Sequence, residues 1–88
     1  MVIEVKILNR LGLHARPAAL IARSAAKFQS AVSLTPQGGD AADAKSILSL
    51  LMLGAPCGTV MALEACGQDE AEAIAELQGL FDSKFDEE

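Results

Sequence analysis

Aromatic side chains are nearly absent from this chain. Its 88 residues include no tryptophan, no tyrosine and three phenylalanines, whereas hydrophobic residues make up 51% of the sequence. The core must therefore be built mainly from alanine, leucine, isoleucine and valine, which suits helices packed on a sheet. The length predicts one domain spanning residues 1–88, with no room for a second.

Positive charge is also scarce. Seven Lys and Arg stand against twelve Asp and Glu, which gives a formal net charge of −5. Because a nucleic-acid-binding protein needs a basic stripe to displace counterions, we expect no nucleic acid partner. No apolar run approaches the roughly 20 residues of a membrane-spanning helix. The amino end lacks the basic segment followed by an apolar segment that is typical of a signal peptide. We therefore expect a cytoplasmic protein with no membrane insertion.

The sequence contains two cysteines and one histidine. Cys57 and Cys66 have no CxxC spacing, and the histidine is far from both in the sequence. We interpret the cysteines as reduced thiols and expect no disulfide, metal site or cofactor.

The single histidine, His14, stands immediately before an expected helix. Pro17 has a preset φ and lacks an amide that would have no intrahelical partner, so the helix should begin near Arg16 or Pro17. A helix N-terminus, here the segment with Ala15, Pro17 and Ala18, favours an anion, and Arg16 adds a guanidinium. These features suit a histidine that carries a phosphoryl group. A capping or packing role for His14 is the alternative.

Hydrophobic periodicity predicts an α+β fold with the element order βαββαβα, an antiparallel sheet and all helices on one face. The expected strands cover residues 2–8, 30–35, 40–44 and 59–66, of which the third suits a sheet edge. The expected helices cover residues 16–28, 47–53 and 69–85. We expect the acidic end, residues 86–88, to be a frayed tail.

The short helix 47–53 has more large apolar residues than one buried face needs. If Leu50 and Leu53 face the sheet, the helical period leaves three aliphatic side chains toward solvent, namely Ile47, Leu48 and Leu51. Such a cluster indicates a partner-binding surface. The alternative is that the first helix and the end of the chain cover this helix on both sides.

Ser46 directly precedes this helix. A serine N-cap is worth about 1 kcal/mol, which explains the residue without any further function. The same helix end would tolerate a phosphate, although the added charge would lie beside the apolar surface.

Two motifs resemble those of the HPr family, the histidine phosphocarriers of the bacterial phosphoenolpyruvate-dependent phosphotransferase system. Residues 12–18, Gly-Leu-His-Ala-Arg-Pro-Ala, are similar to the active-site signature, and residues 45–54 are similar to the regulatory serine motif. The resemblance covers essentially the whole chain and implies an open-faced sandwich of four antiparallel strands and three helices. It also implies that His14 receives phosphate from Enzyme I at Nδ1 and passes it to an Enzyme IIA component. Arg16 would steady the phosphoryl group, and HPr kinase/phosphorylase would act on Ser46.

The branch of the family stays open. Leu11 stands where many sugar-branch members have a small polar residue, and residues 46–53 and 80–88 are also similar to NPr, the nitrogen-related relative. Lys45 beside Ser46 is typical of members regulated on serine. Three hypotheses for the function stay open. The protein is a carrier in sugar uptake and its regulation, an NPr-type carrier in a regulatory relay, or a non-carrier module phosphorylated only on Ser46. In each the protein is expected to be a monomer and not an enzyme, since a hydrolase would need a water-positioning group beside Arg16.

Overall fold

Four strands form one antiparallel sheet in a computed structural model that describes residues 1–87. The strands are β1 (Val2–Lys6), β2 (Ala31–Pro36), β3 (Ala42–Asp43) and β4 (Val60–Cys66). Their spatial order is β1-β4-β2-β3, so that β4 pairs with β1 on one side and β2 on the other. The third strand is a two-residue edge strand, as its weak strand propensity predicts.

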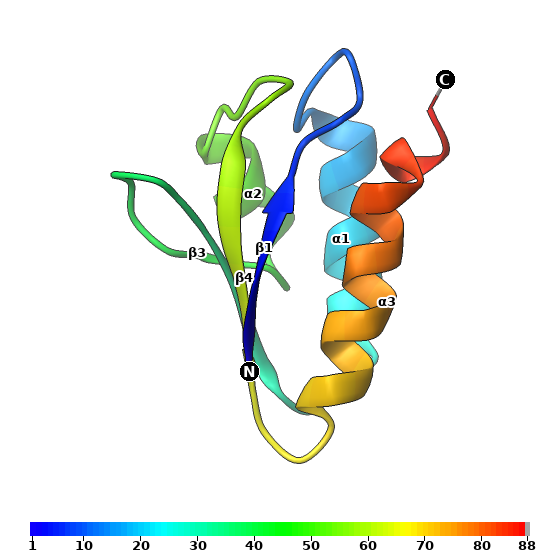
Figure 1. Ribbon diagram of the computed structural model, residues 1–88. Helices are drawn as coiled ribbons and strands as arrows, with labels where there is room; N and C mark the ends of the chain where they lie inside the picture. Colours follow the sequence, from blue (N-terminus) through cyan, green and yellow to red (C-terminus); the bar gives the residue numbers. More distant parts are fainter. Residues whose placement is uncertain (88) are drawn as a thin grey trace.

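Three helices cover one face of this sheet and leave the other face open (Figure 1). They are α1 (Ala15–Ala26), α2 (Ile47–Met52) and α3 (Glu70–Asp82). The α+β open-faced sandwich and the order βαββαβα are thereby confirmed. The expected helix boundaries shift slightly, because α1 begins at Ala15 and ends at Ala26.

The core lies between the helices and the covered face of the sheet. Residues along β4 alternate between buried and exposed, with Met61, Leu63 and Ala65 toward the helices. From the helices come Ile21 and Leu77, which are both fully buried. Aliphatic side chains thus fill most of the core, as the composition requires.

The last helix ends earlier than its periodicity predicts. After Asp82 a short 3₁₀ turn, Lys84–Asp86 (η1), interrupts the α-helix, with φ values of +56° at Lys84, +56° at Phe85 and +59° at Asp86. Such a conformation costs an L-residue about 1–2 kcal/mol. Burial of a phenylalanine, worth about 1.5–3 kcal/mol, offsets part of that cost. Phe85 is fully buried and lies edge-on to Phe81, with ring centroids 5.0 Å apart.

The expected fraying of residues 86–88 is therefore wrong for Asp86 and Glu87. Asp86 belongs to the turn that Phe85 anchors, and the amide of Glu87 donates to the carbonyl oxygen of Lys84 at 3.0 Å. Glu88 lies outside the described residues. Figure 1 shows the C-terminal end of the chain at the same end of the molecule as the loop between β1 and α1.

Candidate functional site

The loop between β1 and α1 is held by a fully buried asparagine. Asn9 donates from Nδ2 to the carbonyl oxygen of Gly12 at 2.7 Å, and the amide of Gly12 donates back to the Asn9 carbonyl at 3.1 Å. Gly12 has a φ of +75°, and a Cβ there would lie 2.7 Å from the carbonyl oxygen of Ala55. Only glycine fits this close approach without strain. The neighbouring amide of Leu13 donates to the same Ala55 oxygen at 2.9 Å.

His14 is the N-cap residue of α1. Its backbone is extended, with φ −103° and ψ −166°, and its carbonyl oxygen accepts the amide of Ala18 at 3.0 Å. Its side chain makes no capping hydrogen bond and remains 36% exposed. The capping alternative thus describes the backbone of His14, whereas its imidazole makes no cap and is partly exposed.

The amides at this helix end differ in whether they are free to bind an anion. The amide of Ala18 is used in the bond to His14, and Pro17 has no amide. Because the first amides of a helix lack intrahelical acceptors, the donors here are those of the exposed residues Ala15 and Arg16. The positive end of the helix dipole lies at the same place.

Arg16 borders a hollow of about 310 Å³. The residues that line it are Arg10, Leu11, Arg16, Asp86 and Glu87. Two guanidinium groups and two carboxylates thus gather at one place, and they come from opposite ends of the sequence. Arg10 lies outside both of the sequence motifs, residues 12–18 and 45–54. Leu11 is 67% exposed, and its side chain has no polar group.

Glu87 is the functional candidate that sequence reasoning missed. One carboxylate oxygen, Oε2, lies 2.9 Å from His14 Nε2, and the other, Oε1, accepts from Asn9 Nδ2 at 3.0 Å. The approach to His14 is close but not aligned as a regular hydrogen bond. The side chain is 12% exposed. Phe85, an apolar residue among charged ones, was the signal that this end packs against the fold.

Ser46 is the N-cap of α2. Its Oγ accepts the amide of Ser49 at 3.1 Å, so the expected N-cap is confirmed. Nothing in this arrangement requires a phosphate. The hydroxyl lies at the edge of the apolar surface that α2 presents.

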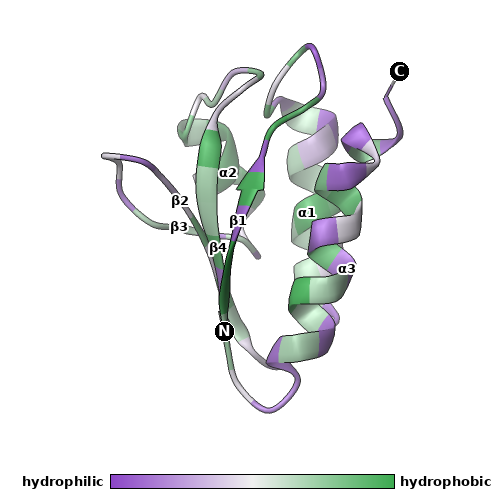
Figure 2. Ribbon diagram, in the orientation of Figure 1, coloured by the Kyte–Doolittle hydropathy of each residue, from purple (hydrophilic) through white to green (hydrophobic). Residues whose placement is uncertain are grey.

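The exposed face of α2 forms an apolar surface. Leu50 is fully buried, and Leu53 packs partly buried against the core. The exposed fractions of the outer side chains are 44% for Ile47, 69% for Leu48, 38% for Leu51 and 78% for Met52. We call these four residues the α2 patch. The helix is green, and therefore hydrophobic, in Figure 2. The expected exposure of Ile47, Leu48 and Leu51 is thus confirmed, and the alternative, in which the first helix and the end of the chain cover α2 on both sides, is wrong.

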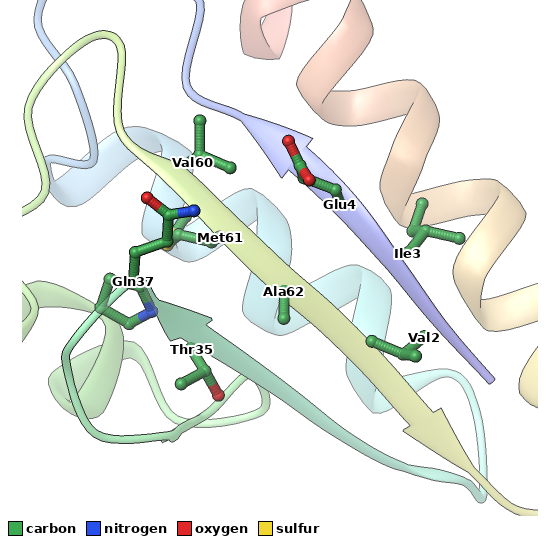
Figure 3. Close-up of a pocket in the computed structure, with 9 residues that line it drawn as sticks. Val2, Ile3, Glu4, Thr35, Gln37, Val60, Met61 and Ala62 are labelled. Atoms are coloured by element: carbon green, nitrogen blue, oxygen red, sulfur yellow. The ribbon is translucent and has the colours of Figure 1, made fainter.

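Two larger hollows of the surface lie away from His14 and Arg16. They measure about 460 and 630 Å³ and occupy the uncovered face of the sheet. Figure 3 shows the first, where Val2, Ala62 and Thr35 come from three neighbouring strands. Glu4 is the only ionisable residue that lines it. Neither hollow is lined by a histidine or an arginine, so neither suits phosphoryl transfer.

Cys57 and Cys66 are exposed free thiols. Within residues 1–87, no three His, Cys, Asp or Glu side chains are grouped in a way that could hold a metal ion. None of the helices in that part of the chain is long and apolar enough to cross a membrane.

Known proteins resemble this chain over nearly its full length. The family model described as "PTS HPr component phosphorylation site" matches residues 2–83. Phosphocarrier protein HPr of Treponema pallidum is 42% identical over 84 residues, covering 96% of this chain and 94% of the relative. Phosphocarrier protein NPr of Proteus mirabilis is 45% identical over 85 residues, covering 97% and 94%. The crystal structure of HPr-C-His from Thermoanaerobacter tengcongensis superposes with a TM-score of 0.94 at 43% identity, covering 100% and 98%.

Proposed function

The chain belongs to the HPr family of phosphocarrier proteins of the phosphotransferase system, and from this premise we propose that His14 is its phosphoryl-carrying residue. The observation that supports the proposal is a histidine with a 36% exposed side chain at the start of α1. No other residue of the chain is a histidine. The protein acts as a substrate of partner enzymes and catalyses no reaction of its own.

The phosphoryl donor is Enzyme I, and the acceptor is an Enzyme IIA component. In the first transfer the lone pair of His14 Nδ1 forms a bond to phosphorus. The bond between phosphorus and the donor breaks, and its electron pair leaves with the donor. Arg16 and the amides of Ala15 and Arg16 stabilise the charge on the phosphoryl oxygens. The second transfer reverses these steps toward the acceptor, which needs an exposed site and no metal or cofactor within this chain.

Both partners dock through the α2 patch. Large exposed aliphatic side chains provide desolvated contacts in protein interfaces, and Ile47, Leu48 and Leu51 are the residues that we assign to this contact. Ser46, at the edge of the patch, is the residue that HPr kinase/phosphorylase would modify. A phosphate there would weaken docking by charge and desolvation.

The branch decides which acceptor the protein serves. We propose a cytoplasmic, monomeric carrier in sugar uptake and its regulation, supported by Lys45 beside Ser46. The specific observation that favours the NPr-type regulatory relay is the C-terminal segment, which is similar to that of NPr and reaches His14 through Glu87. The two readings differ in the Enzyme IIA that removes the phosphoryl group.

Labelling with Enzyme I and phosphoenolpyruvate tests the proposal. We expect an acid-labile label on the wild-type protein and on Ser46→Ala, and none on His14→Ala. The labelled protein is then mixed with a sugar-specific or a nitrogen-related Enzyme IIA, and loss of label identifies the branch. Label that persists in His14→Ala would refute the assignment. A protein that is labelled only on Ser46, by a serine kinase, would be the non-carrier module.

A further inference from the structure

The Glu87 carboxylate contacts both ends of the loop between β1 and α1, at Asn9 and at His14. Its Oε1 accepts from Nδ2 of Asn9, a side chain with 0% exposure, at 3.0 Å. Its Oε2 lies 2.9 Å from Nε2 of His14. Because Asn9 also donates to the Gly12 carbonyl, the carboxylate is attached to the same loop that places His14 at the start of α1.

The turn that follows α3 positions this carboxylate beside His14. Three residues with positive φ, from Lys84 to Asp86, form a turn after α3, and the buried ring of Phe85 anchors this turn. Glu87 follows directly and has a side chain only 12% exposed. A side chain delivered by a packed turn has fewer alternative positions than one on a free tail, so its contact with His14 is part of the folded structure.

A carboxylate beside Nε2 determines where the ring keeps its proton. A neutral imidazole has one N–H and one lone pair, and an ionised carboxylate can only accept hydrogen bonds. The charge of Glu87 therefore favours the proton on Nε2 and leaves the lone pair on Nδ1. The same arrangement of carboxylate and histidine orients imidazole ligands in metal sites and the base in catalytic triads. Hydrogen bonds of this kind are often poorly aligned before a partner binds, and tighten in the complex.

We propose that Glu87 is a positioning residue, which holds the proton of His14 on Nε2 so that Nδ1 presents its lone pair to the phosphoryl donor. The proposal rests on the proposed function of His14. During transfer, Nδ1 forms the new bond to phosphorus, the bond between phosphorus and the donor breaks with its electron pair leaving on the donor, and Nε2 keeps its proton. The carboxylate stays beside Nε2 and thus avoids the position that the phosphoryl group takes on Nδ1.

Nitrogen NMR of the single histidine tests the proposal directly. The two ring nitrogens of ¹⁵N-labelled protein are recorded on the neutral ring at alkaline pH for wild type, Glu87→Ala and Glu72→Ala. Glu72 is an exposed glutamate on α3, so the control makes the same chemical change away from His14. We expect the wild type and the control to keep the proton almost entirely on Nε2. In Glu87→Ala the fraction with the proton on Nδ1 should rise several-fold.

Transfer kinetics with Enzyme I give the second measurement. Since Glu87 is not in the α2 patch, Glu87→Ala should lower kcat roughly tenfold and leave KM unchanged. An unchanged tautomer ratio in folded Glu87→Ala would overturn the proposal, as would an unchanged kcat. Failure of the proposed function is a separate result. In that case Enzyme I does not label the wild-type protein, while the tautomer ratio still decides what Glu87 does to the ring.

Discussion

The ammonium group of Lys45 donates a hydrogen bond to the carbonyl oxygen of Phe28, with Nζ and the oxygen 2.9 Å apart. Phe28 lies just beyond the end of α1, where carbonyl oxygens lack intrahelical donors and the helix dipole is negative. Lys45 in turn directly precedes Ser46, the N-cap of α2. The side chain of Lys45 thus connects the C-terminal end of α1, the helix that His14 caps, to the start of α2.

Substitution Lys45→Met removes this ammonium group and keeps the aliphatic stem. We expect the free energy of unfolding to fall by about 1.5 kcal/mol, the lower end of the usual net value of a hydrogen bond from a charged group. Urea denaturation followed by circular dichroism measures the change. Lys6→Met serves as the control, because Lys6 is exposed on β1. Equal denaturation midpoints for Lys45→Met and the control would show that the bond contributes no stability.

The Ser46 N-cap predicts opposite effects for two substitutions. Ser46→Ala removes the acceptor for the Ser49 amide and should cost about 1 kcal/mol. Ser46→Asp keeps an acceptor and adds a negative charge at the helix start, so its melting temperature should equal or exceed that of the wild type. Thermal unfolding of the three proteins checks both expectations. If Ser46→Ala melts like the wild type, the hydrogen bond to Ser49 does not stabilise α2.

Substitutions in the α2 patch should change the affinity for a partner without changing the stability of the fold. Leu48 is 69% exposed, so Leu48→Ala should leave the unfolding temperature nearly unchanged and weaken binding to Enzyme I several-fold. Ser46→Asp should weaken binding as well, by placing a charge at the edge of the patch. Calorimetric titration measures both. Val2→Ala is the matched control, since Val2 is 60% exposed on the open face of the sheet. Equal affinities for all these proteins would assign the patch no role in docking.

Periodicity was sufficient to predict the faces that lie in the core. In β1 and β4 the side of the strand that meets the helices carries the apolar residues, so the alternation of apolar and polar residues in the sequence shows which side is buried. The exposed side of α2 followed from the same argument, because one short helix cannot bury Leu48 and Leu50 together. The boundaries of elements were less well predicted, since helix ends depend on the contacts that follow them.

The C-terminal contribution to the site could not be predicted from local pattern. Phe85 adopts a positive φ because its ring packs on Phe81, and that packing exists only in the folded chain. Asn9 and Glu87 are 78 residues apart in the sequence, and neither occurs in a motif that indicates their contact. The residues around His14 were found because they are contiguous, whereas Glu87 required the tertiary structure.

Arg16 provides a test that separates chemistry from folding. It is exposed in the first turn of α1, so Arg16→Ala should melt within a few degrees of the wild type. Phosphoryl transfer to His14 should slow by roughly tenfold or more, which corresponds to about 1.4 kcal/mol of lost transition-state stabilisation. Quenched-flow kinetics with Enzyme I measure the rate. Arg23→Ala is the control, as Arg23 is an exposed arginine in the last turn of the same helix. Equal rates in both variants would contradict the assignment.

The carboxylate of Asp69 joins two turns at one end of the molecule. It accepts the amides of Gln29 and Ser30, each at 2.9 Å, and also the hydroxyl of Ser30. The hydrogen bond from the Ser30 hydroxyl, followed by the one from the Gln29 amide, lowers the pKa of this carboxyl below its ordinary value. A carboxyl with a lowered pKa in the folded state stabilises the protein above its unfolded pKa, and this contribution is lost as the pH falls through the folded pKa.

Substitution Asp69→Asn should therefore lower the melting temperature by a few degrees at neutral pH. The difference from the wild type should begin to shrink as the pH falls below about 4, the ordinary pKa of an aspartate, and should vanish once the pH has passed through the lowered folded pKa of Asp69. The pKa of Glu76 is also lowered, chiefly by its hydrogen bond with Lys27, but Glu76 is present in both proteins and cancels in the comparison. Melting curves recorded between neutral and acidic pH measure the difference, with Asp40→Asn in an exposed turn as the control. A difference that stays constant throughout this range would show that the charge of Asp69 does not stabilise the turns, because neutralising it by protonation would then have no effect.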